Sequence, residues 1–186
     1  MPILAVVSLV FVGLLAFVAT RPSQFRILRK RTMKVDASAV FALINDLHQW
    51  ERWSPWDKLD PNLARTYSGS ASGVGAKYHW AGAKNVGEGT MEVLESTPDQ
   101  RVLIDLHFIR PFEARNKTTF TIEREGEAVS VSWIMEGTNN FMAKAFGLFM
   151  NMDKMVGADF EKGLAAIEST LAGEAPSKQG AVAAAA

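Results

Sequence analysis

The stretch DLHQWERWSPWD, residues 46–57, contains three of the five tryptophans in this 186-residue chain: Trp50, Trp53 and Trp56. Each tryptophan side chain buries on the order of 150–250 Å². Three of them in one short polar segment therefore favour a segment that folds down onto an apolar interior. Proline disfavours helix at the residue before it, so Pro55 predicts a short helix through Trp53, a corner, and a Trp56 that leaves along another wall. The rings fit ordinary core packing or the mouth of a ligand cavity.

Composition narrows the class of protein. The length favours one domain with room for a tail or an anchor. Twenty basic and twenty acidic residues balance to a formal charge of zero, which gives no basic field for nucleic acid. The chain has no cysteine, so disulfides, thiolate nucleophiles and cysteine-based zinc sites are excluded.

The N-terminal run ILAVVSLVFVGLLAFVAT, residues 3–20, is apolar and uncharged. Its length meets the lower limit for crossing a hydrocarbon core of about 30 Å. A cleaved signal peptide would need basic residues before the run, and a buried globular helix would show a polar stripe. We therefore expect an uncleaved transmembrane anchor over residues 1–22. By the positive-inside rule, the domain is expected on the cytoplasmic side of the plasma (inner) membrane as a single-pass protein, because the basic residues all follow the run: Arg21, Arg26, Arg29, Lys30 and Arg31.

Apolar periodicity predicts the secondary structure of the rest of the chain. A strand is expected over residues 24–35 and a short helix around Val40, Phe41 and Ile44. Successive antiparallel strands with one apolar face each are expected over residues 64–68, 76–81, 86–95, 101–109, 114–123 and 128–135. One long helix over residues 141–171, rich in Phe and Met in its first half, should cover that face. Residues 173–186 read as a disordered tail.

Five segments carry a resemblance to a known family. They are ASAVFALINDLHQWERWSPW (37–56), GEGTMEV (87–93), PFEARN (111–116), VSWIMEG (131–137) and NMDKMVGADFEKGLAAI (151–167). The combination resembles the START/Bet v 1-like (SRPBCC) superfamily, also named polyketide cyclase/dehydrase and lipid transport, in a bacterial subgroup with an N-terminal membrane segment. The resemblance implies an α+β helix-grip domain over residues 23–172, with a curved antiparallel sheet of about seven strands wrapped on the C-terminal helix. It also implies a hydrophobic-ligand cavity, but no particular reaction.

The chain shows no recognisable catalytic or metal motif. The three histidines, His48, His79 and His107, fall on separate elements without ligand spacing, so we predict no metal and no cofactor. Polar residues that could face a cavity are Tyr78, Glu88, Arg115, Asn116 and Glu136. A buried carboxylate among them would have a raised pKa and could act as an acid or base. The competing interpretation places each of them on the solvated outer face or in cross-strand pairs.

These patterns predict a pocket between the sheet and the last helix. Its ligand-binding residues are predicted to be Trp53, Trp56, Tyr78, Trp80, Glu88, Met91, Phe108, Asn116, Phe149 and Met152. The expected function is membrane-anchored binding of a hydrophobic small molecule or lipid. One alternative is a polyketide cyclase or dehydratase-like enzyme in which Glu88, Tyr78 or Arg115 polarises carbonyls. Another is a ligand-responsive regulatory or scaffold protein at the membrane. The same rings could also close a solid core.

Overall fold

A computed structural model describes residues 2–83 and 86–174 of the chain. The elements in order are α1 (Pro2–Thr20), β1 (Gln24–Met33), α2 (Ala37–Asn45), the 3₁₀ helix η1 (Leu47–Gln49), α3 (Trp50–Trp53), β2 (Ala64–Gly69), β3 (Ala76–Ala81), β4 (Glu88–Thr97), β5 (Arg101–Arg110), β6 (Ala114–Glu125), β7 (Ala128–Thr138), α4 (Phe141–Phe146) and α5 (Met152–Glu174).

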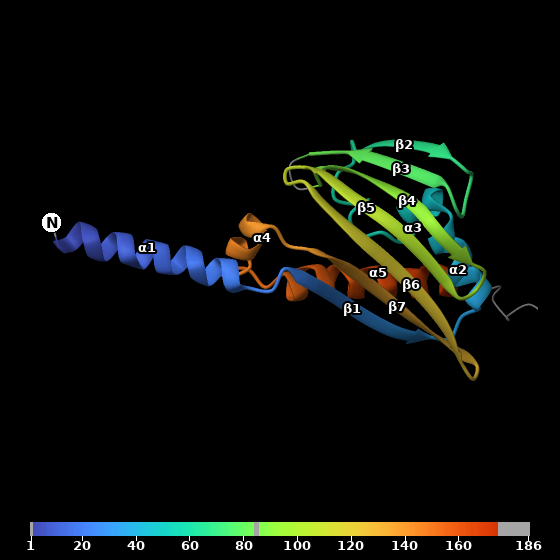
Figure 1. The fold of residues 1–186 in the computed structure, drawn as a ribbon. Coiled ribbons are helices and arrows are strands. Elements are labelled where there is room, and N and C mark those ends of the chain that lie inside the picture. Colours follow the sequence, from blue (N-terminus) through green and yellow to red (C-terminus); the bar gives the residue numbers. More distant parts are fainter. Residues whose placement is uncertain (1, 84–85, 175–186) are drawn as a thin grey trace, which may run out of the picture.

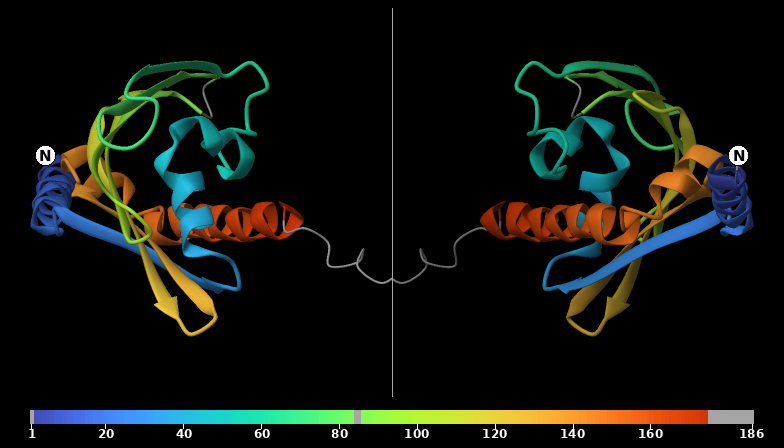
Figure 2. Two further views of the ribbon diagram at one scale, coloured as in Figure 1. Left: turned by 90° about the vertical axis from the view of Figure 1, so that its right-hand side faces the viewer. Right: turned by 90° about the vertical axis from the view of Figure 1, so that its left-hand side faces the viewer.

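The strands form one antiparallel sheet in the order β1-β7-β6-β5-β4-β3-β2. The first strand therefore pairs with the last, while the other strands pair with their neighbours in sequence. The sheet curves, and α5 lies on its concave side together with α2 and α3 (Figures 1 and 2). This arrangement confirms the predicted α+β class, with a seven-stranded curved sheet gripping a C-terminal helix.

The core lies between the concave face of the sheet and α5. Alternate residues of each strand point inward, which buries Val102 and Ile104 on β5 and Phe120 on β6. From α5, Phe160 and Leu164 follow each other at helical spacing and are also buried. Because one face of every strand meets this core, a break in the helix would leave part of the sheet uncovered.

The tryptophan segment folds as its sequence predicts, and its indoles serve a second purpose. The Trp50 Nε1–H donates to the Ile44 carbonyl at 3.0 Å, and the Trp53 Nε1–H donates to the Leu43 carbonyl at 3.0 Å. Carbonyls in the last turn of a helix have no partner within the helix. The two indoles therefore satisfy carbonyls near the end of α2 while their rings fill the core.

The single C-terminal helix predicted over residues 141–171 is wrong, because the structure has two helices there. The short α4 ends at Phe146, and α5 starts at Met152. The Asn151 side chain accepts a hydrogen bond from the Lys154 N–H at 3.0 Å, as an N-cap does. Because α5 begins as a new helix with Asn151 as its cap, residues 147–151 do not continue α4. Phe149, which lies between the two helices, is 86% exposed. Residues 173 and 174 of the predicted tail belong to α5, and residues 175–186 lie outside the described residues.

The apolar N-terminal run is helical as α1, which projects from the domain (Figure 1). Within the residues that the structure describes, no helix combines the length and apolar character needed to cross a membrane. This finding overturns the predicted transmembrane anchor over residues 1–22 and the predicted single-pass placement in the plasma membrane with a cytoplasmic domain.

The basic residues behind that topology prediction have structural partners. Four of them lie on β1 and pair with carboxylates: Arg26 with Glu136, Arg29 with Asp153 and Glu161, Lys30 with Glu125, and Arg31 with Glu168. The fifth, Arg21, lies over the Phe17 ring, 5.5 Å from its centroid. The four charges on β1 therefore take part in contacts within the domain.

Candidate functional site

A cavity of about 260 Å³ lies between the concave face of the sheet, the tryptophan segment and the first turns of α5. This volume is just below the ~300–1,000 Å³ typical of small-molecule pockets. Most of its wall is apolar. The lining residues are Trp50, Ser54, Trp56, Asp57, Leu63, Tyr78, Trp80, Val86, Met91, Leu106, Phe108, Thr118, Trp133, Met135, Val156 and Phe160.

Strand alternation places Tyr78 and Trp80 of β3 on the same inner face. Trp80 pairs with Gly89 across β3 and β4, and its ring lies directly over that glycine. A Cβ at position 89 would come within 2.4 Å of Trp80 ring carbons. Gly89 therefore makes room for the indole, which meets Phe108 edge to face at a centroid distance of 5.9 Å.

The opposite wall is built from stacked rings. Trp133 of β7 stacks on Phe160 of α5 with centroids 4.2 Å apart and an interplanar angle of 4°. Trp56 meets both rings edge to face, at 5.8 Å from Trp133 and 6.3 Å from Phe160. A Cβ at Gly163 would lie 2.6 Å from a Trp133 ring carbon, so this glycine lets α5 approach the indole.

One edge of the cavity is polar. The Asp57 side chain is 6% exposed, and its Oδ1 accepts hydrogen bonds from Arg65 Nε at 2.9 Å and from the Tyr78 hydroxyl at 3.3 Å. Burial and then the Asp57 charge raise the pKa of Tyr78 above its ordinary value, which keeps its phenol protonated. Burial acts to lower the pKa of Arg65, but the hydrogen bond and charge of Asp57 outweigh it and raise that pKa.

Two other polar groups of the wall have no such support. The Thr118 hydroxyl and the Trp133 Nε1–H are buried and have no hydrogen-bond partner among the described residues. The two side chains are 3% and 2% exposed. Burying a polar group without a partner costs roughly 1–3 kcal/mol of folding free energy. Each of these two unpaired groups therefore lowers the stability of the folded protein.

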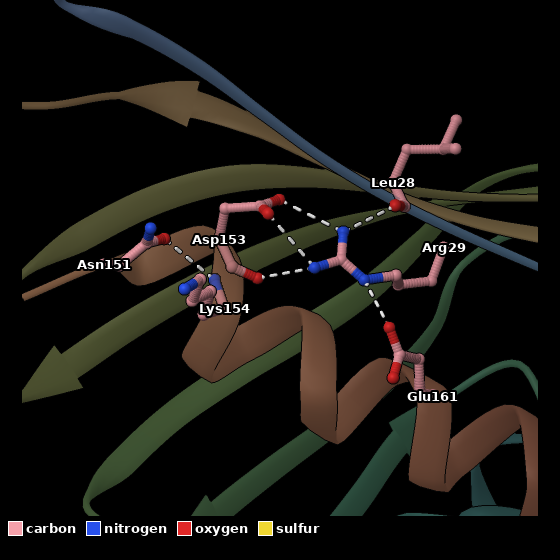
Figure 3. A network of polar contacts seen from close by, with 6 residues as sticks. All are labelled: Leu28, Arg29, Asn151, Asp153, Lys154 and Glu161. Carbon is pink, nitrogen blue, oxygen red and sulfur yellow. Dashed lines mark hydrogen bonds and ion pairs between the residues drawn. The ribbon is translucent and has the colours of Figure 1, made fainter.

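The start of α5, which closes the cavity, is held to β1 by one arginine (Figure 3). Arg29 donates from Nη2 to the Asp153 carbonyl at 2.8 Å and to Asp153 Oδ2 at 3.1 Å, and from Nε to Glu161 Oε1 at 2.8 Å. These hydrogen bonds, led by Asp153, raise the pKa of Arg29, and Arg29 in turn lowers the pKa of Asp153. A Cβ added at Gly157 would lie 1.9 Å from Arg29 Nη2, so the guanidinium occupies the space that a side chain there would need.

The structure brings together half of the residues predicted to bind ligand. Five line the cavity, namely Trp56, Tyr78, Trp80, Met91 and Phe108. The other five do not, namely Trp53, Glu88, Asn116, Phe149 and Met152. No contact in the structure supports a ligand-binding role for these five residues. In each case the structure gives a physical reason for the different position.

Trp53 is fully buried behind the wall in the core, and Phe149 and Met152 are exposed because the helix breaks before α5. Asn116 is buried, but its amide lies against Met135 Sδ at 3.9 Å rather than on the cavity. Glu88 pairs with His79 at 3.2 Å and with Arg110. The hydrogen bond from His79 lowers the pKa of Glu88, the opposite of the raised value expected for a buried acid.

Sequence reasoning missed several wall residues. It assigned no site role to Asp57, although this residue ends the tryptophan segment, and none to Thr118 or Trp133. The signal available for Thr118 was its register, since it shares the inward face of β6 with Phe120. No sequence signal pairs Arg65 with Asp57, because that contact depends on how residues 54–63 turn back towards β2.

Each histidine side chain contacts a carboxylate, and the three pairs lie on separate parts of the surface. His48 contacts Asp46 at 2.9 Å, His79 contacts Glu88, and His107 contacts Glu113 at 3.3 Å. Across the described ranges, no three His, Cys, Asp or Glu side chains gather closely enough to hold a metal ion.

Comparison with known proteins agrees with this fold. Residues 24–172 match the model of the family described as polyketide cyclase / dehydrase and lipid transport. No curated protein matches the sequence.

Solved structures share the fold at low identity. A crystal structure of a Chromobacterium violaceum protein is 14% identical with a TM-score of 0.57, covering 78% of this chain and 96% of that one. The major latex-like protein 151 of Panax ginseng is 12% identical with a TM-score of 0.58, covering 80% of this chain and 98% of that one. The Aha1 dimer of Colwellia psychrerythraea is 13% identical with a TM-score of 0.51, over 79% and 96% of the two chains. At these identities the likeness concerns the fold alone.

Proposed function

This chain belongs to the polyketide cyclase/dehydrase and lipid transport family, and we propose that its domain binds a hydrophobic small molecule or lipid in the cavity between the sheet and α5. The observation that carries the proposal is the cavity itself, because about 260 Å³ of space remains inside an otherwise packed aromatic core. Protein interiors normally pack to the density of organic crystals. A space lined by indole and phenyl rings favours an occupant that loses water on entering.

The driving force would be burial of apolar surface, at about 25 cal/mol per Å² removed from water. Trp56, Trp133 and Phe160 supply one wall, and Trp80 and Phe108 supply the other. The Asp57, Arg65 and Tyr78 cluster marks one polar edge, which would orient an amphipathic ligand.

The enzymatic alternative keeps little of its predicted machinery. Of the three residues expected to polarise carbonyls, Tyr78 lines the cavity, while Glu88 and Arg115 do not. The phenol of Tyr78 already donates to Asp57. No observation therefore favours a cyclase or dehydratase reaction over binding.

Fluorescence titration with N-phenyl-1-naphthylamine, an apolar probe, tests the proposal. We expect saturable binding of one probe per chain with enhanced probe emission. Native mass spectrometry of the freshly purified protein should show a small molecule that leaves on denaturation and competes with the probe. A linear, unsaturable titration in protein shown to be folded and ligand-free would refute the proposal.

A further inference from the structure

The turn that follows α3 presents two polar side chains with free hydrogen-bonding capacity to the cavity. Ser54 and Asp57 both line the cavity, and both are more than nine-tenths buried. Within the described part of the chain, the Ser54 hydroxyl has no hydrogen-bond partner. Asp57 accepts both of its side-chain hydrogen bonds at Oδ1, which leaves Oδ2 free. The unpartnered polar atoms that are fully occluded belong to other residues, namely Thr118, Ser130 and Trp133.

Backbone hydrogen bonds fix the position of both residues. The Ser54 N–H donates to the Trp50 carbonyl at 2.7 Å as the C-cap of α3. The Asp57 carbonyl accepts from Arg65 Nη2 at 3.1 Å, which ties the other end of the turn to β2. A hydroxyl and a carboxylate are therefore held three residues apart at the wall of one cavity, before any ligand binds.

The charge at this edge of the cavity is negative. Arg65 Nε lies 2.9 Å from Asp57 Oδ1 and 3.4 Å from Glu51 Oε1, so two carboxylates share one guanidinium. Neither Arg65 nor Glu51 lines the cavity, and Asp57 carries the charge among the described lining residues. A buried anion would meet this carboxylate without a cation of its own, which is strongly unfavourable. A cation would gain a partner there.

The rest of the wall suits the body of an organic cation. The indoles of Trp56 and Trp80 line the cavity together with the ring of Tyr78. Aromatic faces attract cations, and tryptophan does so most strongly. A protonated nitrogen carries donors and no acceptor, and hydrogen bonds from a charged donor to a carboxylate are the strong ones. Such a group therefore complements Asp57 Oδ2 and the Ser54 hydroxyl oxygen.

We propose that the cavity binds an organic cation, an apolar molecule of ring size with a protonated nitrogen whose N–H groups donate to Asp57 Oδ2 and Ser54 Oγ. This inference rests on the proposed binding function and adds the chemical class of the ligand. It separates amines and amidines from neutral hydrocarbons and from anions such as fatty acids.

Three naphthalenes of matched shape test it by isothermal titration calorimetry at about pH 7. They are the cation 2-naphthamidinium, the hydrocarbon 2-isopropenylnaphthalene and the anion 2-naphthoate, each with a planar three-atom substituent. In a cavity without a partner for it, the cation would bind much more weakly than the hydrocarbon, because its charge loses water. We expect the parent protein to bind the cation at least as tightly as the hydrocarbon, and the anion most weakly.

Two variants remove the proposed acceptors. Asp57→Asn should shift the ratio of amidinium to hydrocarbon Kd at least tenfold against the amidinium, and Ser54→Ala about three- to tenfold. Asp105→Asn, which makes the same change of net charge on the outer face of β5, should leave the ratio unchanged. Because Asp57→Asn also removes a partner of Arg65, hydrocarbon binding serves as the measure of an intact cavity. Ser54→Ala leaves that ion pair in place and decides the test if Asp57→Asn does not fold.

The outcomes separate the two proposals. If folded parent protein binds none of the three compounds, the binding function fails and this inference fails with it. If the hydrocarbon binds but the parent binds the amidinium more weakly, the cation inference is overturned while the apolar cavity stands. An amidinium-to-hydrocarbon ratio that stays the same in every folded acceptor variant would also overturn it, as would tightest binding of 2-naphthoate.

Discussion

Trp53 and Trp56 show how two like residues, three positions apart, take different roles. Trp53 has no exposed surface, and its N–H is fixed to the Leu43 carbonyl at 3.0 Å. Trp56 is only partly buried, and its ring contacts Trp133 and Phe160 at the cavity wall. The corner at Pro55 separates the core position from the wall position. Stability should therefore depend mainly on the first, and binding mainly on the second.

Alanine substitutions make this a prediction. Trp53→Ala removes a fully packed ring and a satisfied N–H, and we expect it to lower the unfolding free energy by about 3–5 kcal/mol. Trp56→Ala enlarges an existing cavity, and we expect a loss of less than about 2 kcal/mol with at least a tenfold weaker affinity for N-phenyl-1-naphthylamine. Urea denaturation and probe titration on both variants measure this. Equal stability losses would show that Trp56 is an ordinary core residue.

Asp153 provides a prediction for pH. Arg29 holds the pKa of Asp153 below its ordinary value of 3.8. A carboxyl whose pKa is depressed by folding stabilises the folded state above its unfolded pKa, and this contribution is lost as pH falls through the folded pKa. Asp153→Asn should therefore be less stable than the parent at about pH 7. At about pH 2.5 the difference in stability between variant and parent should be small. A difference between parent and variant that persists unchanged at the lower pH would contradict the assigned ion pair.

At the scale of elements, the position of α5 decides whether the cavity exists. Val156 and Phe160 from its first turns line the cavity, while Leu164 and Ile167 further along fill the core. The start of the helix is fixed by the Asn151 cap and by Arg29, which reaches from β1 to Asp153 and Glu161 (Figure 3). A single arginine therefore couples the edge strand to the element that closes the cavity.

Gly157 tests that coupling. An added Cβ would meet the Arg29 guanidinium, so Gly157→Ala should displace it and cost about 1–2 kcal/mol of unfolding free energy relative to Gly173→Ala. Gly173 lies in the same helix with nothing within 4 Å of an ideal Cβ, which makes it the matched control. In an Arg29→Met background, Gly157→Ala should no longer destabilise, since alanine is intrinsically the better helix former. Equal effects of Gly157→Ala in both backgrounds would show that Arg29 is not the obstacle.

At the scale of the whole molecule, periodicity predicted the sheet because each strand needs one apolar face. The strand predicted over residues 101–109 agrees closely with β5, which covers Arg101–Arg110. Periodicity failed at residues 147–151, where apolar residues continue the helical spacing although the chain leaves the helix axis. The apolar residues of this segment favour a continuous helix. The Asn151 side chain instead caps the first turn of a new helix, α5.

The candidate site was less predictable than the fold, because it depends on contacts between distant segments. Inward register identified Tyr78, Trp80, Met91 and Phe108 on the strands. It could not place Asp57 beside Arg65, since that ion pair depends on the course of the loop between α3 and β2. The topology prediction failed for a related reason: basic residues after an apolar run look alike whether they face a membrane or pair with α5, as Arg29 and Arg31 do.

Filling the cavity from α5 tests most directly whether it is a binding site. Val156→Phe places a ring inside the wall, while Met155→Phe adds one at the neighbouring exposed position. Valine and phenylalanine have similar helix propensities, and the cavity can take the added volume, so we expect both variants to stay within about 1 kcal/mol of the parent in stability. Calorimetry with 2-isopropenylnaphthalene should then show one site in the parent and in Met155→Phe, and none in Val156→Phe. Undiminished binding by a folded Val156→Phe variant would contradict a ligand site between the sheet and α5.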